Sequence, residues 1–411
     1  MSVREIESPR RRAAWALTDQ ILSTTTNFGL SVILARNVDT TQYGAFAVGF
    51  TVYALLLGVS RAFSTDPLIV RFSNRSHEEQ RDAAGTAVAT GIMVGAVVGV
   101  IVLAAGMAVA QPLGSALVAF GIGLPFVLWQ DTYRYQFIAA RRPHLAALND
   151  LVWLVALGLL LVVAVSADAG TAAPYILAWA AAAALAAGVG AFEARAWPQA
   201  RRGIDWLRHH SDLNLRFAAE FLLLTGGPNL VLLGVAALAG YTEAGGLRGA
   251  FVLLGPVTVV ATGLVIAVVP EGVRIKDWDR TRLRRLVYLL AGTLSIAVVG
   301  WAVVVWRLPD RIGTELLGDT WPASQRLMVP LGIASAGMLA SAGLAAGLRS
   351  LAAARESLRA AVPTIALLVV GGVVGAAIDD GVGAVRGMIV PAWIGVVLYQ
   401  RQFHRALAAS A

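Results

Sequence analysis

Eight charged residues lie within or beside long apolar runs, where their chemistry differs from that of a surface charge. They comprise four arginines and four carboxylates: Arg36, Arg61, Arg134, Arg248, Asp19, Asp66, Asp131 and Glu220. An ionisable group at membrane depth is costly, and by default it marks a transport pathway or an ion pair. These residues are therefore the candidates for a functional site.

The four arginines suit the binding of a phosphate group, because guanidinium is planar, pairs bidentately with phosphate and stays charged. At 1.5 Å per helical residue, Arg61 lies roughly 25 Å along its run from the outer end. Arg134 falls at a similar depth, on the same helix face as Asp131. The alternative is that the arginines reach phospholipid headgroups or neutralise Asp66 and Asp131.

Asp19 and Glu220 occupy matched places in the two halves of the chain. A carboxylate that is partly desolvated has a raised affinity for a proton, and it can also coordinate sodium. Asp19, Glu220, Asp66 and Asp131 are thus candidates for ion coupling. The alternative for Asp19 and Glu220 is capping of a helix end or pairing with a neighbouring arginine.

The composition requires that these residues be held by helices in lipid. Hydrophobic residues make up 57% of the 411 residues and charged residues only 14%, whereas soluble proteins carry about 25% charge. The absence of cysteine excludes disulfides, thiolate catalysis and Cys-ligated metal sites. No cofactor and no metal site is expected. A net charge of +8 indicates basic loops rather than nucleic-acid binding.

Apolar runs between charge clusters predict an all-α, polytopic integral membrane protein with about 12 transmembrane helices. The predicted spans are 14–35, 44–70, 84–110, 114–138, 146–166, 173–193, 216–238, 246–270, 286–306, 325–348, 360–378 and 384–402. With a cytoplasmic N-terminus, 26 basic residues fall on the inner side and six on the outer side. This asymmetry predicts that both termini are cytoplasmic. Glycines spaced by four, such as Gly371 and Gly375, predict close helix packing.

The predicted spans divide six and six into lobes 1–202 and 216–411, joined by a cytoplasmic linker 203–215. The linker contains apolar residues that suit either a short interfacial helix or an ordinary polar connection. Weak similarity relates the halves, with Pro67–Arg71 matching Pro270–Arg274 at an offset of 203. An even number of spans per half makes such repeats parallel, which is an architecture of transporters.

The N-terminal segment carries a family resemblance. Its matching residues are Trp15, Asp19-Gln20, Thr26-Asn27-Phe28, Ala35-Arg36 and Tyr43–Ala47. This pattern resembles the polysaccharide-biosynthesis flippases of the MOP exporter superfamily. The resemblance covers about 60 residues clearly and is suggestive around 240–275. It implies two six-helix lobes around a central cavity and alternating access.

The resemblance also implies a function: export of a lipid-linked oligosaccharide across a bacterial inner membrane for cell-surface polysaccharide assembly. The substrate headgroup would then be a polyprenyl pyrophosphate, received by Arg61 and Arg134 and held near the exit by Arg36 and Arg248. The implied partners are this glycan lipid, membrane lipids, H⁺ or Na⁺, and glycan-assembly proteins.

Two other functions remain open from the sequence. One is a cation-coupled multidrug exporter of the same superfamily, and the other is a non-transporting scaffold of a glycan-assembly complex. An enzyme is not expected, because the five histidines all fall on the predicted cytoplasmic side and no G-x-x-x-x-G-K-[ST] motif occurs.

Overall fold

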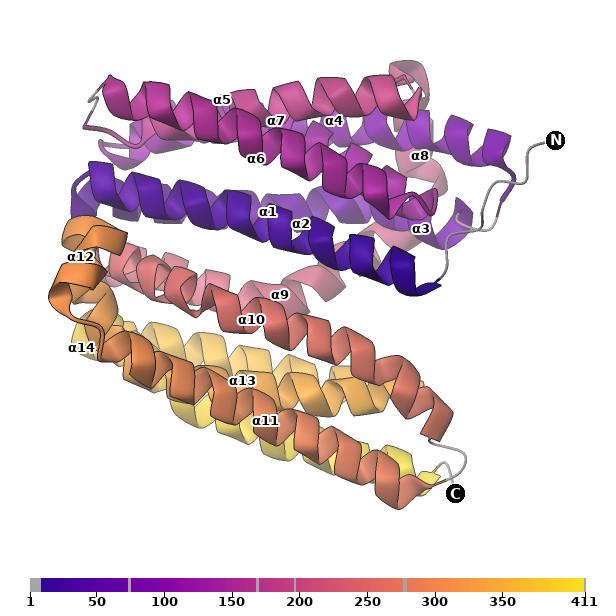
Figure 1. Cartoon of the computed structure of the whole chain (residues 1–411), viewed down its shortest axis with the longest axis vertical. Coiled ribbons are helices and arrows are strands. Elements are labelled where there is room, and N and C mark those ends of the chain that lie inside the picture. The colour runs from indigo at the N-terminus through magenta and orange to yellow at the C-terminus, as the bar shows by residue number, and fades with distance from the viewer. Residues whose placement is uncertain (1–8, 73–74, 168–169, 196, 276–278, 410–411) are drawn as a thin grey trace. The chain divides into compact units, whose positions relative to one another are not determined.

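The structure, a computed structural model, describes residues 9–72, 75–167, 170–195, 197–275 and 279–409 (Figure 1). All regular secondary structure in these ranges is helical. The contacts divide the chain into unit 1, Met1–Val38 with Gly49–Leu222, and unit 2, Asp39–Val48 with Leu223–Ala411. The predicted all-α class is confirmed.

Unit 1 contains the first eight helices and the beginning of the ninth. They are α1 (Pro9–Asn37), α2 (Thr40–Phe63), α3 (Thr65–Phe72), α4 (His77–Ala108), α5 (Leu113–Ala139), α6 (Pro143–Ser166), α7 (Ala173–Ala194), α8 (Ala200–His209) and α9 (Ser211–Ala239). Within this unit α5 packs against α4 and α7, and α1 packs against α6. The first residues of α2 and the end of α9 belong to unit 2.

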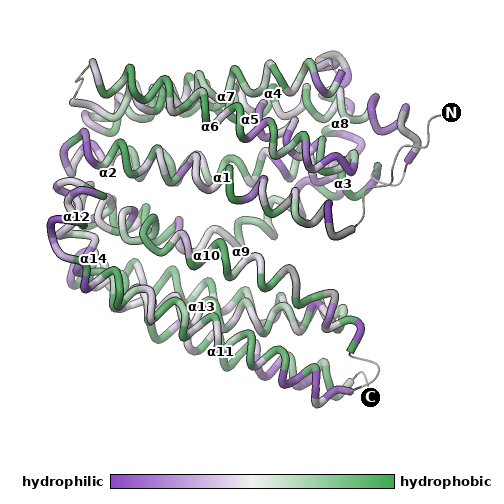
Figure 2. Tube along the Cα trace, in the orientation of Figure 1, coloured by the Kyte–Doolittle hydropathy of each residue, from purple (hydrophilic) through white to green (hydrophobic). Residues whose placement is uncertain are grey.

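Unit 2 is built mainly on α13, which packs against α10, α11 and α14. Its further helices are α10 (Tyr241–Ile275), α11 (Arg280–Trp306), α12 (Asp310–Leu317), the 3₁₀ turn η1 (Gly318–Thr320), α13 (Trp321–Ser350) and α14 (Ala354–Ala409). In both units hydrophilic residues gather toward helix ends (Figure 2). Large apolar side chains such as Leu159 and Ile296 are 67% and 75% exposed, as lipid-facing residues are.

Nine helical stretches of the described chain are long and apolar enough to cross a membrane. One of them, α14, contains two of the predicted spans, because its backbone leaves helical geometry at Asp379 and Asp380. Of the other two predicted spans, one falls on α1, which is more polar, and the other on α9, in which Gly226–Ala239 is a shorter apolar stretch. In α1 the hydroxyls of Thr24, Thr25 and Thr26 donate to carbonyls four residues earlier, so this polarity is satisfied within the helix.

The two halves of α14 approach each other through glycines. A side chain at Gly375 would run into the backbone of Gly383, and one at Gly371 into the backbone of Gly387. Only a residue without Cβ permits this backbone contact. The packing role predicted for Gly371 and Gly375 is confirmed.

Helix α8 is docked on unit 1. Trp206 is 5% exposed and donates through Nε1 to the carbonyl of Phe63, at the point where α2 ends. Arg71 of α3 donates to the carbonyl of His209 and to the Asp212 carboxylate. The 203–215 segment therefore forms helical structure that contacts α2 and α3.

We expect the docking of α8 to weaken in acid. His210 is 5% exposed beside the Trp206 ring, and burial lowers the pKa of His210 below its ordinary value. The folded state thus favours neutral His210, and its contribution to stability is present above about pH 6.5 and is lost as the pH falls. The free energy of unfolding should be lower at pH 5.5 than at pH 8. His210→Phe should reduce this difference, and an unchanged pH dependence in that variant would contradict the assignment.

Candidate functional site

A group of charged and amide side chains is buried inside unit 1, among helices α1, α2, α5 and α6. We call it the charge network; its members are Asp19, Arg61, Gln130, Asp131, Arg134, Asn149 and Asp150. Helix α5 supplies three of them within five residues, so that they project from neighbouring positions of one helix. The network joins α1 and α2 to the consecutive helices α5 and α6, which lie far from them in the chain.

Arg61 and Asp131 form the more accessible half of the charge network. Arg61 lies in the last turn of α2 and donates to Asp131 through Nε at 2.8 Å and through Nη2 at 2.6 Å. The Arg61 guanidinium also lies 4.4 Å from the centre of the Tyr135 ring. Its side chain keeps 23% exposure, against 9% for Asp131. Arg61 is thus bound bidentately yet reachable from one side.

Arg134 forms the deeper half. It donates to Asp19 of α1 through Nε at 3.0 Å and through Nη2 at 2.6 Å, and their side chains are only 6% and 3% exposed. Nη1 of Arg134 lies 4.0 Å from Asp131 Oδ1. Since Asp131 also binds Arg61, this carboxylate lies between the two guanidinium groups. A shift of Asp131 toward Arg134 would leave Arg61 without its partner.

Asp150 of α6 is the third carboxylate and is fully buried. Its Oδ1 accepts from Gln130 Nε2 at 2.9 Å. Its Oδ2 lies 3.1 Å from Arg134 Nε but accepts no hydrogen bond from the residues that the structure describes. Three carboxylates thus face two guanidinium groups, which leaves one acidic group in excess. A buried excess carboxylate is a place where a proton can bind.

Amide side chains complete the network. Gln130 donates to Asn149 Oδ1 at 3.0 Å, and Asn149 donates to the carbonyl of Ala186 in α7 at 2.6 Å. Both amides are fully buried. Because an unpartnered polar group is costly in this environment, these bonds hold the Asp150 side chain of α6 in one position relative to α5 and α7.

Four of the eight residues singled out from the sequence meet in the charge network: Asp19, Arg61, Asp131 and Arg134. The similar depth expected for Arg61, Asp131 and Arg134 agrees with this. Arg61 and Arg134 are both paired with carboxylates. For Arg61 and Asp131 this is the pairing that the sequence analysis gave as the alternative to phosphate binding.

The remaining four residues lie elsewhere. Asp66 is half-buried in the first turn of α3, and Arg36 is exposed in the last turn of α1, beside a cavity against α6. Arg248 of α10 belongs to unit 2, where it interacts electrostatically with buried Tyr43. The side chain of Glu220 lies outside the described residues.

Sequence reasoning missed Asp150, Gln130 and Asn149. A signal was available for two of them, because Asn149 and Asp150 fall inside the predicted span 146–166. A charged residue within a span such as Asp150 is expected to have a partner of opposite charge. In the sequence Arg134 already has Asp131 as an apparent partner at i, i+3, so nothing there indicates that Arg134 also pairs with Asp150. Gln130 is uncharged and gave no such signal.

The arrangement of long apolar helices is that of a polytopic, all-helical membrane protein. No protein-family model matches the chain, and no curated protein matches it by sequence. Solved structures do. The chain is similar to a multidrug resistance MATE family transporter of the MOP superfamily, in an inward-facing conformation, with a TM-score of 0.75 and 12% identity, covering 97% of this chain and 100% of that one.

Two further structures show the same likeness. The lipid II flippase MurJ has a TM-score of 0.69 at 10% identity, with 97% of this chain and 90% of that chain covered. A MOP superfamily transporter from Pyrococcus furiosus has a TM-score of 0.60 at 11% identity, with 97% and 95% covered. The chain therefore has the fold of the MOP superfamily transporters, as the N-terminal pattern predicted.

Proposed function

We propose that this protein is a flippase that moves a lipid-linked oligosaccharide, carried on a polyprenyl pyrophosphate, from the inner to the outer leaflet of a bacterial inner membrane. The observation that carries the proposal is the bidentate Arg61–Asp131 pair, in which the Arg61 side chain keeps 23% exposure. Like a carboxylate, a pyrophosphate can present two oxygens to a guanidinium fork, so it can take the place of Asp131 on Arg61. The likeness to the lipid II flippase MurJ supports the same class of substrate.

The charge network suggests how binding is coupled to conformational change. When the headgroup displaces Asp131 from Arg61, Asp131 has Arg134 as its nearest alternative partner, at 4.0 Å. The Arg134 guanidinium then faces three carboxylates, Asp19, Asp131 and Asp150. The excess negative charge of these carboxylates favours uptake of a proton by one of them. Helices α1, α2, α5 and α6 carry these groups, so the exchange of partners alters their mutual packing. Alternating access then follows from two arrangements of one network.

The other predicted residues have subsidiary parts in this proposal. Arg36 and Arg248 hold the headgroup near the outer exit, and Asp66 and Glu220 contribute to ion coupling. No catalytic step is required, because transport breaks no covalent bond. The inner-membrane location and the cytoplasmic position of both termini belong to the same proposal, with the charge asymmetry of the loops as their support.

Transport in proteoliposomes tests the proposal. A fluorescent polyprenyl-pyrophosphate glycan is placed in the bilayer with purified protein, and a membrane-impermeant quencher reports how much of it changes leaflet. Arg61→Ala should slow movement at least about tenfold, since a charge-assisted hydrogen bond to the headgroup contributes roughly 1.5–3 kcal/mol. Arg311→Ala is the matched control, because Arg311 is 89% exposed on α12 and should be replaceable without effect.

A second variant separates function from stability. Arg61→Gln combined with Asp131→Asn removes one charge of each sign and leaves the excess of one buried carboxylate unchanged, so it should fold like the wild type and still transport poorly. Rapid movement of the glycan lipid in this double variant would exclude Arg61 as the headgroup ligand. No movement with wild-type protein would exclude the flippase.

A cation-coupled multidrug exporter is the second candidate, and the excess carboxylate of the charge network favours it. Three carboxylates against two guanidinium groups leave one carboxylate that can exchange a proton. The likeness to a multidrug resistance MATE family transporter points the same way. In the same vesicles, movement of a cationic dye against a proton or sodium gradient, without movement of any glycan lipid, would select this function.

A further inference from the structure

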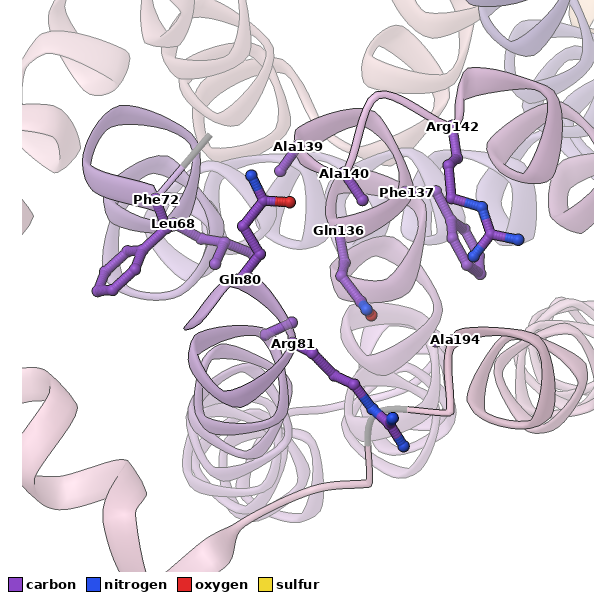
Figure 3. A pocket seen from close by; sticks show the side chains of 11 residues that line it. Leu68, Phe72, Gln80, Arg81, Gln136, Phe137, Ala139, Ala140, Arg142 and Ala194 are labelled. Carbon is purple, nitrogen blue, oxygen red and sulfur yellow. The ribbon is translucent and has the colours of Figure 1, made fainter. Parts of the chain in front are cut away.

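Unit 1 contains a cavity with its own polar chemistry, separate from the charge network and from the cavity beside Arg36. It has a volume of about 230 Å³ and is formed by the end of α3, the beginning of α4, and the last turns of α5 and α7 (Figure 3). Because these four helices all begin or end here, the cavity lies at the level where the unit meets the membrane–water interface. The charge balance of the loops predicts that this is the cytoplasmic face.

Two arginines give the cavity a positive charge. Arg81 of α4 and Arg142, which precedes α6, both line it, and none of its described lining residues is acidic. Arg81 donates through Nε to the carbonyl of Arg195, which orients the guanidinium, and among the described residues no acceptor is bound to its Nη groups. Glu193 is within electrostatic reach of Arg142, and together the three groups still carry a net positive charge.

Gln136 supplies the observation that points to a ligand. Its side chain is 7% exposed and lines the same cavity, and its Oε1 has no hydrogen-bond partner among the described residues. Figure 3 shows the Gln136 side chain extending from α5 into the space lined by Gln80, Arg81 and Arg142. A buried amide oxygen without a partner is costly. A ligand that brings a hydrogen-bond donor would remove that cost.

The rest of the lining is apolar. Leu68 and Phe72 of α3 face the cavity, together with Phe137 of α5. Nearby, Val70 of α3 is 61% exposed, so the surface beside the cavity is also suited to hydrocarbon. A cationic rim above apolar walls, at interface depth, matches a molecule with an anionic headgroup and an apolar tail.

We propose that this cavity binds the headgroup of a membrane phospholipid, with the phosphate on Arg81 and Arg142 and a hydroxyl or ammonium donor of the headgroup on Gln136 Oε1. The bound lipid joins the ends of α3, α4, α5 and α7, and it stabilises unit 1 at this face. The site is distinct from the proposed transport site. The test of this lipid site measures binding of a bilayer phospholipid, so the outcome for the lipid site is independent of the outcome for the flippase proposal.

Native mass spectrometry of the delipidated protein in detergent gives the affinity directly. Phosphatidylglycerol, which has headgroup hydroxyls, should bind more tightly than phosphatidylcholine, whose headgroup has no donor. The double variant Arg81→Ala, Arg142→Ala should bind phosphatidylglycerol about 100-fold more weakly, at about tenfold for each charge-assisted bond. Gln136→Leu should bind both lipids with a smaller preference for phosphatidylglycerol, because the two arginines still favour the anionic headgroup. Arg285→Ala, at an exposed arginine at the beginning of α11, is the matched control and should bind as the wild type does.

The outcomes separate cleanly. Equal affinity of the wild type and the double arginine variant for phosphatidylglycerol would overturn the site. Competition by soluble glycerol phosphate as effective as that by the lipid would assign the cavity to a free phosphate compound and overturn the lipid assignment. An unchanged lipid preference in Gln136→Leu would overturn the role of the amide. Melting temperatures without added lipid establish that each variant is folded, and Arg142→Ala alone provides a milder test, because Arg142 is exposed.

Discussion

Replacement of Arg134 by methionine is expected to destabilise the protein by about 3–5 kcal/mol, because it leaves buried carboxylates without their cation. Asp19 and Asp150 are 2% and 0% exposed, and Arg134 lies within 3.1 Å of both. Methionine fills much of the same volume, so the effect reports the lost charge more than a cavity. The free energy of unfolding, measured by denaturant titration in micelles, checks this expectation.

Two companion variants identify the cause. Adding Asp19→Leu to Arg134→Met should recover at least about 1 kcal/mol, since groups in contact are strongly non-additive. Arg386→Met removes an exposed arginine that pairs with Asp379, and it should cost less than about 1 kcal/mol. If Arg134→Met proved as mild as Arg386→Met, the charge network would not be the buried ion-pair cluster described above.

Gly375→Ala should destabilise unit 2 by about 3 kcal/mol, at the upper end of what overpacking costs. The new Cβ would meet the carbonyl carbon and oxygen of Gly383 in the other half of α14. These atoms belong to the backbone and cannot move aside as a flexible side chain does. The two halves of α14 must then separate, which also disturbs the contact between Gly371 and Gly387. The melting temperature of the purified protein would report the loss.

Gly300→Ala is the matched control for Gly375→Ala. Gly300 lies inside α11 of the same unit, and a Cβ there would meet no atom within 4 Å. The substitution should stabilise the helix by about 1 kcal/mol, because alanine has the higher helix propensity. Opposite signs for the two Gly→Ala changes would establish that close approach, and not helix propensity, governs Gly375. Equal effects of Gly375→Ala and Gly300→Ala on stability would contradict the close packing of the two halves of α14.

Several elements were predictable from the sequence because their signal is local. The long apolar runs predicted the membrane-spanning helices, and even the division of α14 into 360–378 and 384–402 agrees with the non-helical residues Asp379 and Asp380. The break between α2 and α3 after Phe63 was not predicted, since the run 44–70 stays apolar across it. There the interruption is marked by a tertiary contact, the hydrogen bond from Trp206 to the Phe63 carbonyl.

The site divides in the same way. A charged residue in an apolar run can be recognised from the sequence alone, so Asp19, Arg61, Asp131 and Arg134 were each identified without the structure. Which carboxylate binds which arginine depends on how α1, α2, α5 and α6 pack, over sequence separations of 70 residues for Arg61–Asp131 and 115 for Arg134–Asp19. The sequence by itself determined that this is an all-helical membrane protein with charged groups inside its spans, because hydrophobic transfer acts on each segment separately. Only the tertiary structure decided that two arginines share three carboxylates, because ion pairing depends on distances of a few ångströms between segments that the chain order does not relate.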